Sequence, residues 1–493
     1  MSLILALTPF LLLAIWRGTG GLLLEADDAG QYLMHARALV EGRPYGDIDY
    51  IFSERARLVG PRVAPPGLPL LIAPVMAVTG DALLPIRALM LALAAAFLLA
   101  GGLYFVRHGD PRLGTGVALL GGLSVVLLDY STQPLTDLPF AAAVWLALLL
   151  HDSPAPQTPR RALAIALLGG WAILLRPPGV ALLPAILLSA MLRRRGERLW
   201  AAAPALLWLI LGVAALALTD VRQSLLLRTG PAELLRWLEQ SAWGIENATY
   251  YLTALVEAHL YPFPQDIAND VFHVATALLT LLGLAAWLRT HATRTAVAFA
   301  ACYVLVLLVL PFHQARYLWP LYPFLVFGLL NGIVVLVRRF GRRAVRPRAA
   351  AVAFAFALAA LASAAAIITP RATRLDEHAG LQQLAARLRE MDRVTPLRVT
   401  FQKPRTLAWM TGIPVMPHLR QPPDVILAEL RAKCITHVVL PAVDGGITRL
   451  TGGFATLVAG RPDLFAAEYR NDSYELFRLA PPAPGDGAAP DCR

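Results

Sequence analysis

The sequence predicts an all-α polytopic membrane bundle of about 11 transmembrane helices, followed by a small C-terminal α/β soluble domain. Hydrophobic residues make up 57% of the 493 residues and charged residues only 16%, whereas globular domains carry about 25% charged residues. Apolar runs approaching 20 residues recur along the first three quarters of the chain, as expected of helices that cross a bilayer. After Pro370 the composition becomes that of a soluble domain.

Eleven apolar stretches are interpreted as spans. Several are shorter than the roughly 20 residues of an untilted crossing, which leaves tilted or half-buried helices as alternatives. They are residues 2–16, 83–106, 113–129, 137–151, 161–175, 178–192, 199–219, 268–288, 295–311, 317–337 and 349–369. The first run lacks the basic start and the small-residue cleavage site of a signal peptide, so we interpret it as a mature span.

Arginines cluster in the short loops that follow even-numbered spans. These are Arg107 and Arg112, Arg160 and Arg161, Arg193-Arg194-Arg195 with Arg198, Arg289 and Arg294, and the run from Arg338 to Arg348. The positive-inside rule puts these loops and the N-terminus in the cytoplasm, and loop 17–82, segment 220–267 and residues after 370 on the outer side. Because this clustering explains the net charge of +11, nucleic-acid binding is not expected. Joining 161–192 into one span would invert everything downstream.

Residues 370–480 have the pattern of an α/β domain, and a flexible Pro/Gly/Ala-rich tail, 481–493, follows. Leucines at helical spacing are followed by a strand at 397–401, a helix at 424–432, a buried strand at 435–440 and an alternating edge strand at 474–479. No phosphate-binding glycine loop or catalytic constellation occurs here, so a structural or acceptor-docking role is expected. Cys434 and Cys492 are free to pair in an oxidising compartment, although nothing in the sequence requires it.

The first outer loop, residues 17–82, is unusually polar for a chain so poor in charge. It contains the carboxylate pair Asp27-Asp28, then a helical pattern at 29–40, and it ends near Pro65-Pro66. Asp28 is placed to cap that helix, which leaves Asp27 freer to enter a cavity. The second outer segment, 232–260, is rich in aromatic residues, which suits a helix in the lipid headgroup layer or one packed on the mouth of the bundle.

Several charged or polar residues stand at the outer ends of spans, where charged groups are usually paired or functional because burying them is unfavourable. They are Asp27, Asp28, Asp129, Asp137, Arg176, His313, Arg316 and Tyr317. A carboxylate acting as general base and arginines that hold a departing phosphate would suffice for direct transfer of a group from a lipid phosphate. The alternatives are a cap for Asp137, snorkelling for Arg176 and Arg316, and a hydrogen-bonded loop residue for His313. No spacing amounts to a metal site, although a divalent metal is possible.

Five stretches together resemble the integral-membrane glycosyltransferases of the C-type fold, particularly the bacterial branch related to protein O-mannosyltransferases and lipid A aminoarabinose transferases. They are DDAGQYLMHARALVEGRPYGD (27–47), PPGLPLLIAP (65–74), QPLTDLPF (133–140), LLRPPGVALLP (174–184) and ARYLWPLYP (315–323). The resemblance covers about 370 residues. It implies a polyprenyl-phosphate-linked sugar donor, an inverting mechanism and an active site in the first outer loop.

The resemblance also assigns roles to residues. The acidic motif of the first loop falls on Asp27 and Asp28, with Asp27 as the base, and the later Arg-Tyr pair falls on Arg316 and Tyr317, which would bind the donor phosphate. Many relatives have lysine or histidine before the double proline, where this chain has Val63-Ala64. Arg62 is therefore the candidate for that cationic role, and Arg62 and Arg176 are both candidates for binding the donor phosphate. The remaining candidates for substrate contact are Tyr32, Arg55, Arg57, Asp137 and His313.

The resulting hypothesis is a multi-pass glycosyltransferase of the cell inner membrane, working at the periplasmic face with its C-terminal domain on that side. Its partners would be the donor, a lipid, glycan or protein acceptor, and membrane lipids. The rival hypothesis is a transporter or flippase of lipid-linked saccharides, which is disfavoured because no internal repeat is evident and the polar residues collect at one face rather than the midplane. A scaffold that only presents residues 370–493 is a third hypothesis, disfavoured by the ordered polar loops.

Overall fold

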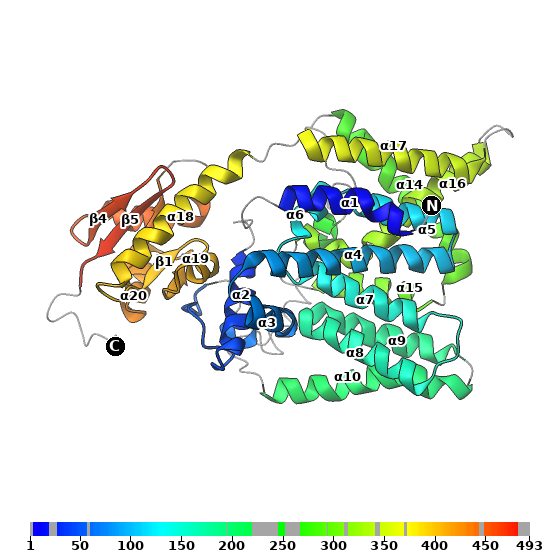
Figure 1. Cartoon of the computed structure of the whole chain (residues 1–493), viewed down its shortest axis with the longest axis horizontal. Coiled ribbons are helices and arrows are strands. Elements are labelled where there is room, and N and C mark those ends of the chain that lie inside the picture. The colour runs from blue at the N-terminus through cyan, green and yellow to red at the C-terminus, as the bar shows by residue number, and fades with distance from the viewer. Residues whose placement is uncertain are drawn as a thin grey trace.

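The computed structural model describes residues 3–18, 27–56, 60–193, 195–218, 245–251, 267–292, 294–309, 314–340, 346–368, 372–442 and 448–481. Most of them form a helical bundle, whose helices run side by side in Figure 1. Its α-helices are α1 (Leu3–Gly18), α4 (Leu83–His108), α5 (Pro111–Gly121), α6 (Val125–Tyr130), α7 (Asp137–His151), α8 (Pro159–Leu175), α9 (Leu182–Met191), α10 (Arg198–Leu218), α14 (Ile267–His291), α15 (Thr295–Val309), α16 (Tyr322–Phe340) and α17 (Pro347–Ile368).

Helices occupy every stretch that the sequence analysis interprets as a span, but three of these stretches are interrupted. The stretch 113–129 divides into α5 and α6, while 3-10 turns open 178–192 (η2, Pro177–Ala181) and 317–337 (η5, Ala315–Leu321). Proline explains η2, because Pro177 and Pro178 cannot donate the backbone hydrogen bonds that would continue α8. In the described part of the chain, four helices are long and apolar enough to cross a membrane: Leu83–His108, Val274–His291, Ala315–Phe340 and Pro347–Ala364.

Helices α14 and α16 pack with their backbones in close contact. A Cβ atom built on Gly283 would lie 1.9 Å from the carbonyl oxygen of Gly328, and one on Gly332 would lie 2.0 Å from that of Leu279. Small residues at helix interfaces are typical of membrane bundles, where they let neighbouring backbones approach. The glycines therefore determine the distance between these two helices.

Gly283→Ala is expected to destabilise the protein by about 1–3 kcal/mol, because the added methyl group forces α14 away from α16. Thermal unfolding of the detergent-purified protein measures this. Gly170→Ala is the matched control, since its Cβ would meet nothing closer than the indole nitrogen of Trp208 at 3.4 Å. Equal melting temperatures for the two variants would contradict the prediction.

Residues 372–481 form the predicted C-terminal α/β domain. Its five-stranded sheet has the order β2-β1-β3-β5-β4, and its helices are α18 (Ala372–Asp392), α19 (Pro404–Thr411), α20 (Pro423–Ala432) and α21 (Thr448–Gly460). The strands are β1 (Val399–Phe401), β2 (Val415–Pro417), β3 (His437–Pro441), β4 (Phe465–Arg470) and β5 (Tyr474–Leu479). The predicted helix at 424–432 and the strands at 397–401 and 435–440 are confirmed as α20, β1 and β3.

The predicted strand at 474–479 is confirmed as β5, but its predicted position at the edge of the sheet is wrong. The segment 474–479 does not lie at the edge of the sheet, because β5 pairs antiparallel with β3 on one side and with β4 on the other. The sequence analysis missed β4, whose residues after Phe465 are mostly exposed and therefore lack the alternation of a half-buried strand. The tail is outside the described residues from 482 onward, as is segment 232–260 except for 245–251, which is helical.

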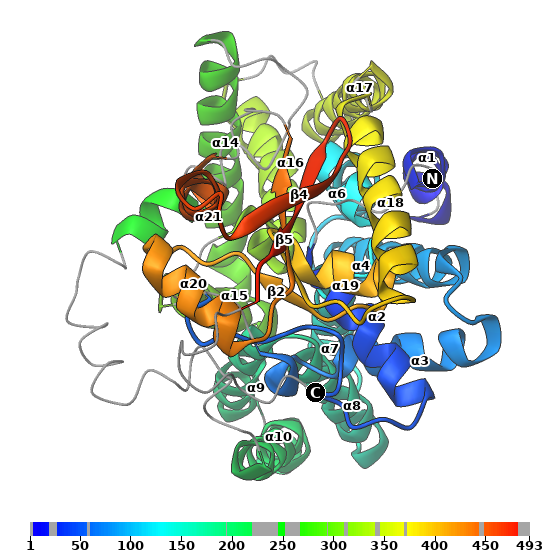
Figure 2. The same cartoon turned by 90° about the vertical axis from the view of Figure 1, so that its left-hand side faces the viewer.

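The first outer loop joins the C-terminal domain to the bundle. Helices α2 (Asp27–Val40) and α3 (Gly67–Thr79) lie between the two in Figure 1, and Figure 2 shows the domain in front of the bundle ends. Tyr50 forms a parallel bridge with Val415 of β2, and the N–H groups of Ile51 and Val415 each donate 2.9 Å hydrogen bonds across it. The loop therefore covers the open edge of β2, which would otherwise present unpaired backbone groups.

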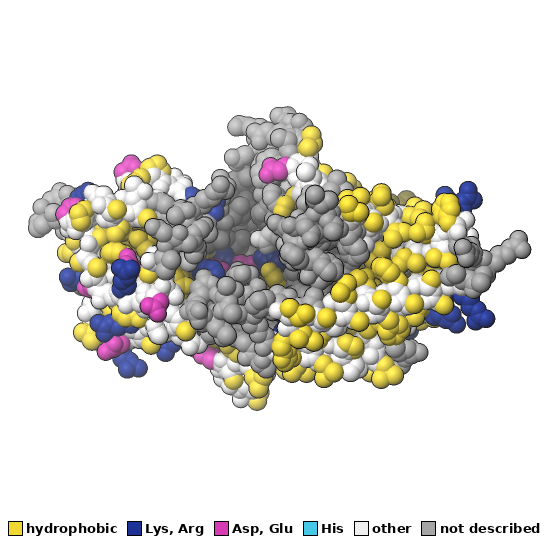
Figure 3. All heavy atoms as spheres, turned by 90° about the horizontal axis from the view of Figure 1, so that it is seen from above, with side chains coloured by type: hydrophobic (Ala, Val, Ile, Leu, Met, Phe, Trp, Pro, Cys, Tyr) yellow, Lys and Arg dark blue, Asp and Glu magenta, His cyan; other side chains and the backbone are white. Residues whose placement is uncertain are grey.

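The surface distinguishes the two parts. On the face that Figure 3 shows, hydrophobic side chains predominate along the described part of the bundle, whereas charged side chains appear on the C-terminal domain and at the far end of the helices. This distribution suits a bundle whose sides face lipid. A recess between domain and bundle has acidic and basic side chains at its floor.

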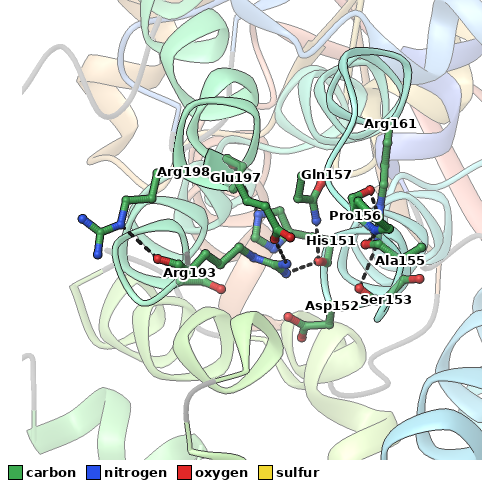
Figure 4. A network of polar contacts seen from close by, with 12 residues as sticks. His151, Asp152, Ser153, Ala155, Pro156, Gln157, Arg161, Arg193, Glu197 and Arg198 are labelled. Carbon is green, nitrogen blue, oxygen red and sulfur yellow. Dashed lines mark hydrogen bonds and ion pairs between the residues drawn. The ribbon is translucent and has the colours of Figure 1, made fainter. Parts of the chain in front are cut away.

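At the far end, some loop arginines hold the fold together (Figure 4). Arg193 donates to the carbonyl of His151, which also accepts a 2.9 Å hydrogen bond from Gln157. The carboxylate of Asp152 accepts the N–H groups of Thr295 and Ala296 at 3.0 and 3.2 Å, so it caps the start of α15. The loop between α7 and α8 is thereby tied to α9 and α15.

Candidate active site

Three carboxylates and three arginines meet at the bundle end that faces the C-terminal domain. They come from the start of α2, the start of α7, the residue after α8, η5 and the start of α19: Asp27, Asp28, Asp137, Arg176, Arg316 and Arg405. The three acids stand at helix N-termini and Arg176 follows a helix C-terminus, so the helix dipoles also stabilise these four charges. Five of the six are residues that the sequence analysis selected.

Asp137 is the most deeply buried acid, with its side chain 2% exposed. It forms an ion pair with Arg176, and a second one of 3.5 Å with Nη1 of Arg316. The guanidinium of Arg176 also lies over the ring of Tyr317, 4.4 Å from its centre. A carboxylate buried this deeply would be destabilising without a positive partner, and either arginine supplies one.

Asp28 lies between two arginines from different domains. Its Oδ2 accepts a 2.8 Å hydrogen bond from Arg316, and its Oδ1 is 2.5 Å from Nη1 of Arg405. Partial burial opposes its ionisation, but Arg405 and Arg316 outweigh that effect and lower the pKa of Asp28 to about 2. Asp28 is therefore a weakly basic anchor for the two arginines.

Asp27 has a different environment. Its Oδ1 accepts the backbone N–H groups of Arg405 and Thr406, both at 3.0 Å, so its carboxylate caps the start of α19. Burial raises the pKa of Asp27, and Arg405 and the Thr406 N–H offset that effect in part. Asp27 is accordingly the stronger base of the adjacent pair.

The structure corrects the capping prediction for this pair. Helix α2 begins at Asp27, so both aspartates lie in its first turn, and Asp28 turns toward arginines instead of capping residues 29–40. The capping aspartate is Asp27, and the helix it caps belongs to the other domain. Asp27 and the N–H groups that it accepts are nearly 380 residues apart in sequence, so no local pattern could predict this cap.

Arg405 is the site residue that sequence reasoning missed. It follows Pro404 at the start of α19, directly after strand β1, and its side chain is only 3% exposed. The sequence analysis assigned no site residue to this domain, because a single arginine after a proline carries no recognisable motif. Only the packing of α19 against α2 reveals it.

The other predicted site residues have varied surroundings. The Tyr32 hydroxyl lies 3.4 Å from that of Thr136 beside the cluster, and Tyr317 is buried. Arg55 forms a 3.4 Å ion pair with Glu429 of the C-terminal domain, and Arg62 is exposed with its stem against Gly46. Arg57 and His313 lie outside the described residues.

Asp129, at the same end of the bundle, forms a 2.7 Å ion pair with Arg17 of α1, which gives it a structural role. Among the residues that the structure describes, no group of three or more histidine, cysteine, aspartate or glutamate side chains has a metal-binding arrangement.

No protein-family model and no curated protein matches this chain. Solved structures do. ArnT from Cupriavidus metallidurans matches with a TM-score of 0.55 in the apo state and 0.57 with undecaprenyl phosphate bound, at 14% identity. The alignments cover 91% and 96% of this chain and 93% and 97% of ArnT. The apo oligosaccharyltransferase of Archaeoglobus fulgidus matches with a TM-score of 0.58 at 12% identity, over 94% of this chain and 72% of its own. The protein therefore has the C-type fold of the integral-membrane glycosyltransferases, as the sequence resemblance predicts.

Proposed function

We propose that the protein is an inverting glycosyltransferase that moves a sugar from a polyprenyl-phosphate-linked donor to a hydroxyl of a lipid, glycan or protein acceptor. The observation that carries the proposal is a charged cluster at one end of an apolar bundle, in which Arg176 and Arg316 pair with Asp137 and Asp28 and Asp27 adjoins Asp28. Such a group joins a general base to a phosphate clamp where a lipid carrier can enter from the side. Neither a flippase nor a scaffold, the two alternatives, needs both a general base and a phosphate clamp.

In the proposed reaction the acceptor hydroxyl attacks the anomeric carbon from the face opposite the phosphate. The bond from that carbon to the phosphate oxygen breaks as the bond to the acceptor oxygen forms, which inverts the configuration. The acceptor proton passes to the carboxylate of Asp27, whose raised pKa suits it to accept one. The phosphate leaves as an anion without protonation, so one base is enough.

Arg316 and Arg176 are the groups that would take the donor phosphate. Both guanidiniums are mostly buried, and in the structure they are neutralised by Asp28 and Asp137. A phosphate that enters competes with these carboxylates for charge-assisted hydrogen bonds and gains negative charge as the sugar leaves. Arginine contacts that strengthen as this charge develops lower the barrier to transfer.

Several observations support a site at the periplasmic face of the cell inner membrane. The site lies at the bundle end opposite the basic loops, which the positive-inside rule places in the cytoplasm. The pairing of Cys434 with Cys492 that an oxidising compartment would allow stays a prediction, because Cys492 lies outside the described residues. A cytoplasmic N-terminus and a periplasmic C-terminal domain need an odd number of crossings, and the 11 that the sequence predicts would satisfy this.

The structural neighbours support the carrier class. One ArnT structure holds undecaprenyl phosphate, and a structure of the Archaeoglobus fulgidus oligosaccharyltransferase, with a TM-score of 0.51, holds a dolichol phosphate and an inhibitory peptide. Proteins of this fold thus bind polyprenyl phosphates. In this protein the outer loops would select the acceptor.

The test is consumption of the donor. Detergent-purified protein is incubated with radiolabelled pentosyl and hexosyl undecaprenyl phosphates and with a panel of lipid, glycan and peptide acceptors. We expect label to pass to one acceptor class with equimolar release of undecaprenyl phosphate. An intact donor with every acceptor, together with donor translocation in proteoliposomes, would contradict the proposal and identify a flippase.

A further inference from the structure

We propose that Arg405 is a positioning residue of this active site, supplied by the C-terminal domain, and that the docked domain completes the site. The inference rests on the proposed function and extends it to a domain to which the sequence assigns no chemistry. Its basis is the geometry of α19 against the first turn of α2.

Arg405 contacts the acidic pair through both its backbone and its side chain. Its N–H donates to Asp27 at 3.0 Å, and its Nη1 lies 2.5 Å from the carboxylate of Asp28. The other face of the guanidinium lies over the ring of Tyr50, 5.3 Å from its centre. With its side chain 3% exposed, Arg405 is fully enclosed at the junction of the two domains.

The approach of the two helices is too close for any side chain between them. A Cβ atom on Gly30 would lie 2.4 Å from the carbonyl oxygen of Arg405. Gly30 therefore permits the contact that brings Arg405 to the acids.

The charge balance explains what the Arg405 side chain does. Asp28 is held by Arg316 and Arg405, and Asp137 by Arg176 and Arg316. When a donor phosphate draws Arg316 and Arg176 toward itself, Arg405 is the cation that stays with the adjacent aspartates. Without it, two neighbouring carboxylates in a partly buried site would repel each other, and one would take up a proton. A protonated carboxyl cannot act as the base.

Several contacts other than the Arg405 side chain also hold the domain against the first outer loop and α2. Backbone hydrogen bonds join residues 49–51 to Val415, Ser53 donates to Glu429 at 2.8 Å, and the Arg37 guanidinium stacks 3.9 Å from the centre of the Trp409 ring. Removing the Arg405 guanidinium therefore tests its effect on the acids separately from docking. Arg37 provides the matched control, because it lies at the same interface of α2 and α19 and pairs with Asp81 outside the acidic cluster.

The experiment compares Arg405→Gln, Arg405→Lys and Arg37→Gln by kcat, donor KM and pH–rate profile of transfer. Arg405→Gln is expected to lower kcat at neutral pH about 100-fold, with the donor KM changed less than about threefold. A base works only when deprotonated, so its rate falls as the pH drops. Removing a nearby cation raises the pKa of the base, so the acid limb of the profile should move to higher pH.

The groups that face the acids are Arg316, Arg176, Asp137, Tyr32, Tyr50 and Arg405, and only Arg405 changes in this comparison. Arg405→Lys keeps the positive charge and should restore the acid limb to its normal position, and Arg37→Gln should leave kcat and the limb unchanged. Each variant is checked by its melting temperature.

Two results distinguish failure of the inference about Arg405 from failure of the proposed function. The inference is wrong if the wild-type protein transfers sugar and Arg405→Gln has the wild-type pH–rate profile. It is also wrong if Arg405→Gln loses no more activity than Arg37→Gln and its acid limb does not move. In either case Arg405 is only a docking residue. If the wild-type protein consumes no donor, the proposed function fails and the inference fails with it.

Discussion

Asp27→Asn should lower kcat about 10²–10⁴-fold, because a general base typically contributes that factor to a proton transfer. Asparagine has the shape of aspartate, and its Oδ1 can still accept the N–H groups of Arg405 and Thr406. The cap on α19 is thus retained while the basic oxygen is lost. The rate of sugar transfer at saturating donor measures the effect, and an unchanged melting temperature shows that the fold is intact.

Asp81→Asn is the control for this variant. Asp81 pairs with Arg37 near the start of α4, and its side chain is 54% exposed, so its loss should leave transfer at the wild-type rate. Asp28→Asn completes the set, since it removes the anchor of two arginines but not the base. A normal rate for Asp27→Asn together with an inactive Asp28→Asn would transfer the base assignment to Asp28.

Much of the site could be predicted from sequence because the bilayer restricts where charges can lie. Once the arginine-rich loops orient the chain, Asp137, Arg176 and Arg316 must all stand at the same end of the bundle. Burial of such charges is stable only if they pair, and the structure pairs these three. For residues at the ends of spans, the membrane topology alone therefore predicts which of them lie at the same end of the bundle.

The remainder depends on packing between domains, for which no such restriction exists. Arg405 reaches the acids because α19 packs on Gly30 and because residues 49–51 align with β2. Neither contact follows from a periodic pattern, and the register of a loop on a sheet edge is set by the folded surface. The same reason explains why Asp27 proved to cap a helix of the other domain.

The cluster is electrically neutral without a substrate, with three carboxylates against three guanidiniums. Neutrality makes the site stable in an apolar bundle before a lipid phosphate arrives, since each buried charge has a partner. A donor phosphate adds negative charge, which the arginines accommodate by exchanging a carboxylate for the phosphate. The residues that lose a partner in this exchange are the ones whose substitution should affect donor binding most.

Arg316→Gln should therefore lower kcat/KM for the donor about 10²–10³-fold, the range for loss of one donor to a developing anion. It should also weaken binding of bare undecaprenyl phosphate, measured by microscale thermophoresis in detergent. The fold should persist, because Asp28 keeps Arg405 and Asp137 keeps Arg176 as partners. Asp27→Asn should have the opposite effect: it should slow the transfer of sugar but leave the binding of undecaprenyl phosphate normal.

Arg316→Lys and Arg43→Gln decide what the Arg316 side chain supplies. Arg316 uses Nη2 for Asp28 and Nη1 for Asp137, and an ammonium cannot reproduce that planar fork. Lysine should thus restore binding of undecaprenyl phosphate more fully than kcat, because charge attracts the ligand while the fork aligns it. Arg43 lies in the first outer loop, after α2, and pairs with Glu41, so Arg43→Gln should behave as wild type. If Arg316→Gln bound undecaprenyl phosphate as tightly as Arg43→Gln, the phosphate would have to lie elsewhere, and Arg316 would serve only to neutralise Asp28 and Asp137.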